Sequence, residues 1–228
     1  METLKGIRVR IREKEVLRLQ GYKDEGPRGD VAEILGREIE EGYRLIRPKA
    51  IFTRVTIREM GEESITLDNG LTLNAGQGLK DWRGSEYLGV ALCTIDSALE
   101  DRVSELFLEG EYPAALMLDS VGSVAVDSVA DYVNHFICQK ARDLDIRVSP
   151  RLSPGYGRWD LREQRAIFAL LPGEKIGVRL NENCMMIPRK SVSFCVGMGK
   201  GLESGRGIDP CRYCGMEGCQ YRRSVASI

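Results

Sequence analysis

A short turn at residues 151–156 places a basic and an aromatic side chain on a sharply bent backbone. It reads Arg-Leu-Ser-Pro-Gly-Tyr and is followed by another glycine. Pro154 fixes its own φ, and the two glycines allow backbone angles that a Cβ would forbid. The guanidinium of Arg151 is therefore held on a rigid loop, where it can bind a carboxylate through two parallel hydrogen bonds. An ordinary turn with Tyr156 packed against the core is the alternative interpretation.

Two aspartates on the preceding helical segment add the opposite charge. Asp127 and Asp131 are four residues apart within 112–139, a stretch without Lys, Arg or Glu, so they share one helix face. A helix exposed to water usually carries long charged side chains, so small polar groups and carboxylates indicate a sheltered face. Two carboxylates there would favour a sulfonium or ammonium group. Together with Arg151 they predict a zwitterionic ligand, and a helix packed under a loop through small residues fits the pattern equally.

Three cysteines near the C-terminus have the spacing of a metal site. Cys211 and Cys214 are separated by two residues, a common chelating arrangement, and Cys219 follows closely. Three thiolates complete neither a tetrahedral zinc site nor a four-cysteine iron–sulfur cluster, so Cys195, Cys184, a partner or a small molecule must supply the fourth ligand. Cys195 is the preferred candidate, because the glycine-rich stretch after it would let the tail fold back. Three reduced thiols without a metal are the alternative.

Hydrophobic periodicity predicts the elements that must position these residues. Expected are a helix over 31–45, a strand over 50–57, a hairpin over 65–73, a strand over 86–95, a helix capped by Asp96, a long helix from Pro113 to about 144, a short helix capped by Asp160, strands over 175–180 and 191–198, and a glycine-rich linker over 197–207. A three-residue loop in the hairpin would set Leu67 opposite Leu71. Strands in runs, with helices grouped between them, indicate an α+β fold: an antiparallel twisted sheet flanked by helices, with a short Cys-rich C-terminal tail.

Length and charge restrict the class of protein. The 228 residues suffice for one large domain with an appendage, and we expect a helix and hairpin region over 1–85, a core over 86–200, and a linker and tail over 201–228. With 33 basic and 34 acidic residues, no global field favours nucleic acid or an anionic membrane. His135 is the only histidine, which excludes sites that need two.

The cysteine count and the apolar stretches bear on the compartment. The first residues contain no apolar region like that of a signal peptide, and no apolar stretch approaches the ~20 residues that span a bilayer. Seven cysteines, an odd number, fit a reducing compartment better than a disulfide framework. We therefore expect a cytoplasmic protein that binds neither membrane nor nucleic acid.

Two motifs in a fixed order resemble the activation domain of cobalamin-dependent methionine synthase. The first is the Arg-Leu-Ser-Pro-Gly-Tyr turn, and the second, Leu-Asn-Glu followed by Pro188 and Ser-Val-Ser, lies downstream; the likeness extends over about residues 86–196. In that family the Arg-x-x-Pro-Gly-Tyr turn binds S-adenosylmethionine, whose sulfonium and amino-acid groups match the inferred zwitterion. The resemblance implies these binding residues: Arg151 for the carboxylate, Pro154, Gly155 and Tyr156 for the shape of the site, and Asp127, Asp131 and Glu182 for the cationic groups.

The resemblance also implies a reaction and its partners. Glycines and the cysteine tail replace the family's tyrosine-containing strand after Ser-Val-Ser, and the Asp-x-His-x-x-Gly cobalamin motif is absent. The pattern is similar to stand-alone activation proteins, which would support reductive methylation of cobalamin supplied by a corrinoid-binding methionine synthase subunit in trans, with an electron donor protein. Because that reaction consumes an electron, an iron–sulfur cluster in the tail is slightly favoured over zinc. The alternative is a redox or metal-binding adaptor in which the tail is the functional part.

Overall fold

The computed structural model describes residues 1–22, 26–156 and 159–202. Its elements are, in chain order, β1 (Glu2–Leu4), α1 (Glu13–Leu19), α2 (Asp30–Leu45), β2 (Lys49–Met60), β3 (Ile65–Leu67), β4 (Thr72–Leu73), η1 (Gly76–Trp82), β5 (Tyr87–Thr94), α3 (Ala98–Glu109), α4 (Tyr112–Asp143), β6 (Arg147–Val148), η2 (Leu161–Glu163), α5 (Gln164–Leu170), η3 (Gly173–Ile176), β7 (Arg179–Leu180), β8 (Met186–Ile187) and β9 (Ser191–Gly199). The tail cysteines Cys211, Cys214 and Cys219 lie outside the described residues.

An antiparallel sheet organises the described part of the chain. Its order is β4-β3-β2-β5-β9-β6, and β1 also pairs with β2. Successive side chains of the central strand β5 point to opposite faces: Ala91 and Cys93 face α4, whereas Val90 and Leu92 face the side covered by η1 and α5. The sheet therefore has an α4-side core and an α5-side core, and the predicted α+β class is confirmed.

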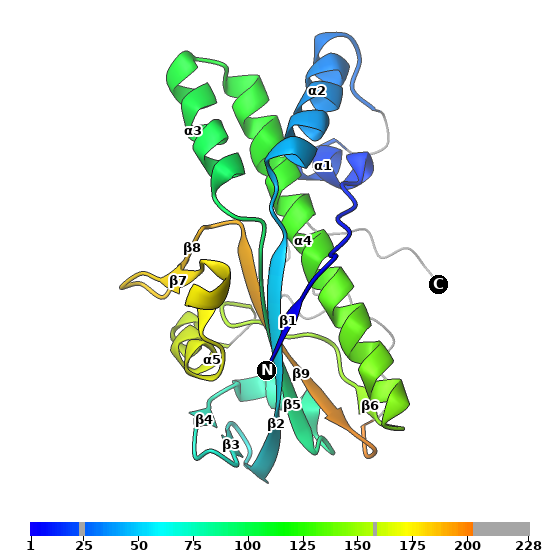
Figure 1. Cartoon of the computed structure of the whole chain (residues 1–228), viewed down its shortest axis with the longest axis vertical. Coiled ribbons are helices and arrows are strands. Elements are labelled where there is room, and N and C mark those ends of the chain that lie inside the picture. Colours follow the sequence, from blue (N-terminus) through cyan, green and yellow to red (C-terminus); the bar gives the residue numbers. More distant parts are fainter. Residues whose placement is uncertain (23–25, 157–158, 203–228) are drawn as a thin grey trace.

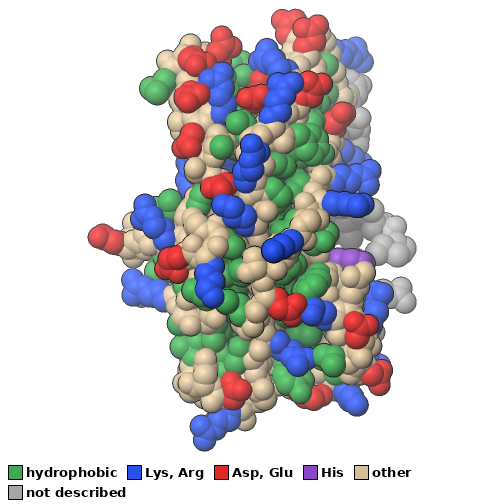
Figure 2. All heavy atoms as spheres, viewed as in Figure 1, with side chains coloured by type: hydrophobic (Ala, Val, Ile, Leu, Met, Phe, Trp, Pro, Cys, Tyr) green, Lys and Arg blue, Asp and Glu red, His purple; other side chains and the backbone are tan. Residues whose placement is uncertain are grey.

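Helix α4 is the central element of the α4-side core. Figure 1 shows it crossing the sheet as a long diagonal rod, with α2 and α3 beside its N-terminal half. Gly122 permits close packing, because an added Cβ would lie 2.6 Å from Leu99 Cδ2. Contrary to the sequence expectation, α4 is long and apolar enough to cross a membrane by length and composition, but 67% of its apolar window is buried inside the fold, as in a core helix. On the face seen in Figure 2, basic and acidic side chains are interspersed.

Several predicted boundaries and registers are confirmed. Ile65 pairs with Leu73, and Leu67 N donates to Leu71 O at 2.9 Å, which is the register of the three-residue loop. Asp160 accepts a hydrogen bond from Arg162 N at 2.8 Å and so caps the helical segment after the turn. The long helix begins with proline in its first turn and ends at residue 143, one residue before the predicted end.

The prediction that Asp96 caps α3 is wrong. Ser97 occupies the cap position, and Asp96 precedes it with a φ of 69°. The Asp96 carboxylate is bound instead by Lys49 Nζ, at 2.6 Å, from the start of β2. This hydrogen bond is the main reason why the pKa of Asp96 lies below its ordinary value. The other carboxylate oxygen, Oδ1, accepts a hydrogen bond from Ser97 N at 3.0 Å, so Asp96 binds the residue before α3 and the start of β2 together without occupying the cap position.

Two glycine-containing stretches also differ from expectation. Residues 175–180 form part of η3 and only two strand residues, because Gly177 adopts a left-handed φ of 77° that ends the turn. The linker expected over 197–207 overlaps β9, since Gly197 and Gly199 are strand residues. An added Cβ at Gly199 would lie 2.8 Å from Glu86 N, so close approach of two backbones explains this glycine.

Candidate ligand site around Arg151

Arg151 is fixed between two attachments to β9. Before it, β6 pairs with the end of β9; after it, Leu152 exchanges two backbone hydrogen bonds with Cys195, at 2.9 and 2.7 Å. Because successive side chains point to opposite faces and Leu152 packs into the α5-side core, Arg151 is directed toward α4. Its guanidinium carbon lies 5.8 Å from the centroid of the Phe194 ring. The fold therefore holds this cation between β9 and α4.

Asp131 of α4 is the acidic neighbour of Arg151. Arg151 Nη1 lies 3.0 Å from Asp131 Oδ1, yet this buried nitrogen makes no hydrogen bond of acceptable geometry with any described residue. The Arg151 side chain is 21% exposed and that of Asp131 is 57% exposed. The guanidinium is thus held while the carboxylate is accessible to solvent. A buried N–H without an acceptor is costly, and a ligand oxygen would remove that cost.

The charge of Arg151 also acts on the α4-side core. Cys93 is fully buried on β5, and its burial raises the pKa of its thiol to about 12. The positive charge of Arg151 opposes this rise.

Asp127 and Asn134 extend the same face of α4 on either side of Asp131. They lie four residues before it and three residues after it, and both are half-buried. Asn134 Oδ1 is buried and has no hydrogen-bond partner among the described residues. The spacing of the sequence places Asn134 on the same polar helix face as Asp127 and Asp131, although only the two aspartates are among the expected binding residues.

The N-terminal half of this helix face has a structural role. Lys190 Nζ lies 2.8 Å from Ser123 Oγ and 2.8 Å from Asp119 Oδ1, and its side chain is only 12% exposed. Gln20 Nε2 donates to Ser120 Oγ at 2.7 Å. These groups anchor α4 to the residue just before β9 and to the residue just after α1. The N-terminal half of this face is therefore a packing surface, as the alternative interpretation expected. Only the part of the face near Arg151 is left to contact a ligand.

The turn after Arg151 is shaped by its backbone and by the tryptophans near it. Gly155 has a φ of 90°, and its N donates to Trp159 O at 2.8 Å. A residue with a Cβ is strained at this φ. Trp159 packs edge to face on Trp82 with ring centroids 5.5 Å apart, which gives the turn a rigid base. The Tyr156 side chain is 65% exposed, so the alternative in which it packs against the core is wrong. Pro154 is buried in the same turn.

Glu182 is not brought together with the other predicted site residues. It is exposed in the turn of the β7–β8 hairpin, where Asn181 Oδ1 accepts hydrogen bonds from the backbone N of Asn183 and Met185. The hairpin packs on the α5-side core through Met186, whereas Arg151 faces the other side of the sheet. Figure 1 shows the hairpin projecting away from the C-terminal half of α4. The sheet therefore separates Glu182 from the Arg151–Asp131 pair.

Cys195 is placed in the core rather than at a surface where the tail would reach it. It is fully buried on the α5 side of β9, and burial raises the pKa of its thiol. A metal ligand must be a thiolate, so this environment opposes ligation. Within residues 1–22, 26–156 and 159–202, no group of three or more His, Cys, Asp or Glu side chains is placed to hold a metal ion. The metal site of the tail thus stays a prediction.

Comparison with known proteins identifies the fold. No family model matches the chain, and no curated protein matches its sequence. Among solved structures, the chain is similar to a crystal structure of the MetH reactivation domain bound to AdoHcy (S-adenosylhomocysteine), with a TM-score of 0.58 and 14% identity. The similarity covers 85% of this chain and 77% of that one. The chain has the fold of the methionine synthase reactivation domain.

Proposed function

We propose that this chain binds S-adenosylmethionine at Arg151 and supports reductive methylation of a cobalamin held by a separate corrinoid-binding methionine synthase subunit. The observation that carries the proposal is the buried Nη1 of Arg151, which lies 3.0 Å from Asp131 but has no hydrogen bond of acceptable geometry among the described residues. Support comes from the fold, because a protein with the same fold has been crystallised with AdoHcy. S-adenosylmethionine has the same amino-acid and adenosine groups and a positive sulfonium.

The amino-acid end of the ligand matches the two charges of the site. In the structure Arg151 and Asp131 face each other at 3.0 Å. A ligand carboxylate takes the place of Asp131 on the guanidinium, and the ligand ammonium pairs with the displaced Asp131. The exchange is favourable because a partly exposed ion pair contributes only about 0–1 kcal/mol. A hydrogen bond to a charged group contributes about 1.5–3 kcal/mol, and the carboxylate offers the buried guanidinium two of them.

The remaining residues of the site bind the other parts of the ligand. Asp127 lies one helical turn before Asp131 and favours the positive sulfonium. Gly155 keeps the backbone of the turn in a conformation that other residues adopt only with strain, and Tyr156 presents an aromatic ring at the surface. Glu182 has no part in this arrangement, because it lies on the far side of the sheet.

In the proposed reaction the corrinoid of the partner is the substrate and the chain presents the methyl donor. One electron from a donor protein and the methyl group of S-adenosylmethionine together convert the cobalt(II) corrinoid to its methylated form, and S-adenosylhomocysteine is released. The corrinoid supplies the nucleophile. The chain's own residues bind the methyl donor and orient its methyl group. Reactants that are held in this way react faster than the same molecules meeting in solution.

A methyl-transfer assay tests this function. The chain is mixed with a corrinoid protein in the cobalt(II) state, a chemical reductant and S-adenosylmethionine labelled in its methyl group, and the corrinoid's absorption and label are followed. We expect methylation only when the chain and S-adenosylmethionine are both present. Arg151→Gln should abolish most of it, while Arg58→Gln, at an exposed arginine of β2, serves as the matched control. Equal methylation without the chain would refute the proposal.

A further inference from the structure

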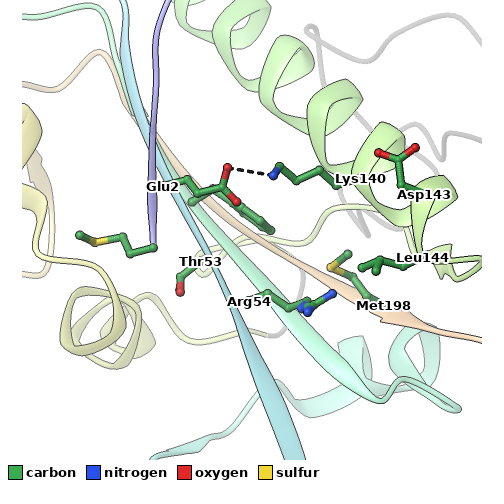
Figure 3. A pocket seen from close by; sticks show the side chains of 9 residues that line it. Glu2, Thr53, Arg54, Lys140, Asp143, Leu144 and Met198 are labelled. Atoms are coloured by element: carbon green, nitrogen blue, oxygen red, sulfur yellow. Dashed lines mark ion pairs between the residues drawn. The ribbon is translucent and has the colours of Figure 1, made fainter.

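A pocket lies beside the C-terminal end of α4. Its volume is about 380 Å³, within the range of small-molecule sites, and it is lined by β1, β2, β9 and the last turn of α4. Figure 3 shows the pocket open between β1 and β2 on one side and α4 on the other. Arg151 lies instead beside Asp131 of α4 and Phe194 of β9, and neither residue lines this pocket, so the two sites are separate.

The base of this pocket is apolar. Phe52 is 4% exposed and Met198 is 1% exposed, and both line the cavity. They meet over Gly89, where an added Cβ would lie 3.1 Å from Met198 Sδ and 3.2 Å from Phe52 Cε2. Leu144 adds an exposed apolar side chain at the rim. Such a base suits the apolar body of a small ligand.

Arg54 at the rim has no acidic partner among the residues that the structure describes. The guanidinium carbon of Arg54 lies 4.6 Å from the centroid of the Tyr87 ring, and no carboxylate of the described residues lies within 4.0 Å of its nitrogens. Lys140, by contrast, is paired with Glu2 at 3.0 Å, the contact dashed in Figure 3. A guanidinium stacked on a ring keeps its N–H edge available for a planar acceptor. Arg54 is thus positioned to bind a carboxylate over the apolar base.

We propose that this pocket binds a small amphipathic carboxylate. The carboxylate accepts hydrogen bonds from Arg54, and the apolar body lies against Phe52 and Met198. A singly charged anion fits better than a phosphate dianion, because Glu2 and Asp143 also line the pocket and the negative end of the α4 dipole points at it. The positive charge of the Arg54 guanidinium then balances the single negative charge of the ligand.

Methionine-methyl NMR localises such binding. The probe is phenylacetate, titrated into the whole chain with ¹³C-labelled methionine methyl groups, and Met198→Leu assigns the signal of Met198. We expect a saturable shift of the Met198 signal, a loss of affinity of about tenfold or more in Arg54→Gln, and unchanged affinity in the control Arg58→Gln. Uncharged phenylacetamide, which has the same ring, should bind about tenfold or more weakly than phenylacetate.

Three results would overturn the inference. The first is a Met198 signal that does not move at tens of millimolar phenylacetate. The second is equal binding of phenylacetamide or of Arg54→Gln, which would make the pocket an apolar cavity without a carboxylate site. The third is displacement of phenylacetate by saturating S-adenosylhomocysteine, which would make the two sites one. Failure of S-adenosylhomocysteine to bind Arg151 would leave this pocket standing, because its readout is independent.

Discussion

Asp131→Asn separates the two roles that the structure gives to the Arg151–Asp131 contact. The substitution keeps the size of the side chain and removes its charge. Asp131 is 57% exposed and its contact with Arg151 lacks hydrogen-bond geometry, so a screened pair of this kind contributes about 0–1 kcal/mol. We therefore expect the free energy of unfolding, measured in urea, to fall by no more than ~1 kcal/mol.

Ligand binding should respond more strongly to the same substitution. The ligand ammonium loses a charged partner, which costs up to about 3 kcal/mol, and the exposure of Asp131 puts the expected loss near the lower end, roughly tenfold in Kd. Calorimetric titration with S-adenosylmethionine measures it. Methylthioadenosine, which lacks the ammonium and the carboxylate, should bind both proteins equally. A loss of several kcal/mol of stability with unchanged affinity would show that Asp131 only compensates Arg151, and would refute its role as a ligand contact.

Three further predictions concern the turn, an ion pair and the tail. Gly155→Ala should lower the free energy of unfolding by about 1–2 kcal/mol, because φ is 90° there; an unchanged urea midpoint would contradict this strained geometry. Because Lys49 lowers the folded-state pKa of Asp96 below 3.8, the stabilisation is present above that value and is lost as pH falls through the lower folded pKa; the stability difference between wild type and Lys49→Met should therefore shrink in acid, and a difference that grows in acid would refute it. Anaerobically purified protein should be brown, and Cys214→Ala should be colourless; colourless wild-type protein with bound zinc would exclude the cluster.

The periodicity of the sequence predicts the elements whose contacts are mostly local. The alternation in residues 65–73 sets the hairpin register, and the small-residue face of 112–143 forms one long helix, because each depends on spacing within a single element. Asp96 shows where local rules fail. Its carboxylate binds Ser97 N and also Lys49 Nζ, and only the folded sheet brings Lys49 into contact with it.

The candidate site could be predicted only in part for the same reason. Arg151 and Asp131 have the charges for a zwitterion, and their order along the chain indicates a common site. Their contact depends on the backbone bridge between Leu152 and Cys195, which turns Arg151 toward α4. No local sequence pattern predicts that bridge, because its two residues are far apart in the chain. Glu182 was expected at the site through the resemblance alone, and the sheet lies between it and Arg151.

A crystal structure of this chain with S-adenosylhomocysteine tests the central claim most directly. The account predicts that the ligand carboxylate occupies the N–H edge of Arg151 and that the ligand ammonium lies beside Asp131. Arg151 Nη1 then has the well-aligned acceptor that no described residue of the free chain provides. The Arg151–Asp131 distance, 3.0 Å here, should increase as the ligand enters. Ligand bound elsewhere, with the Arg151–Asp131 contact intact, would contradict the account.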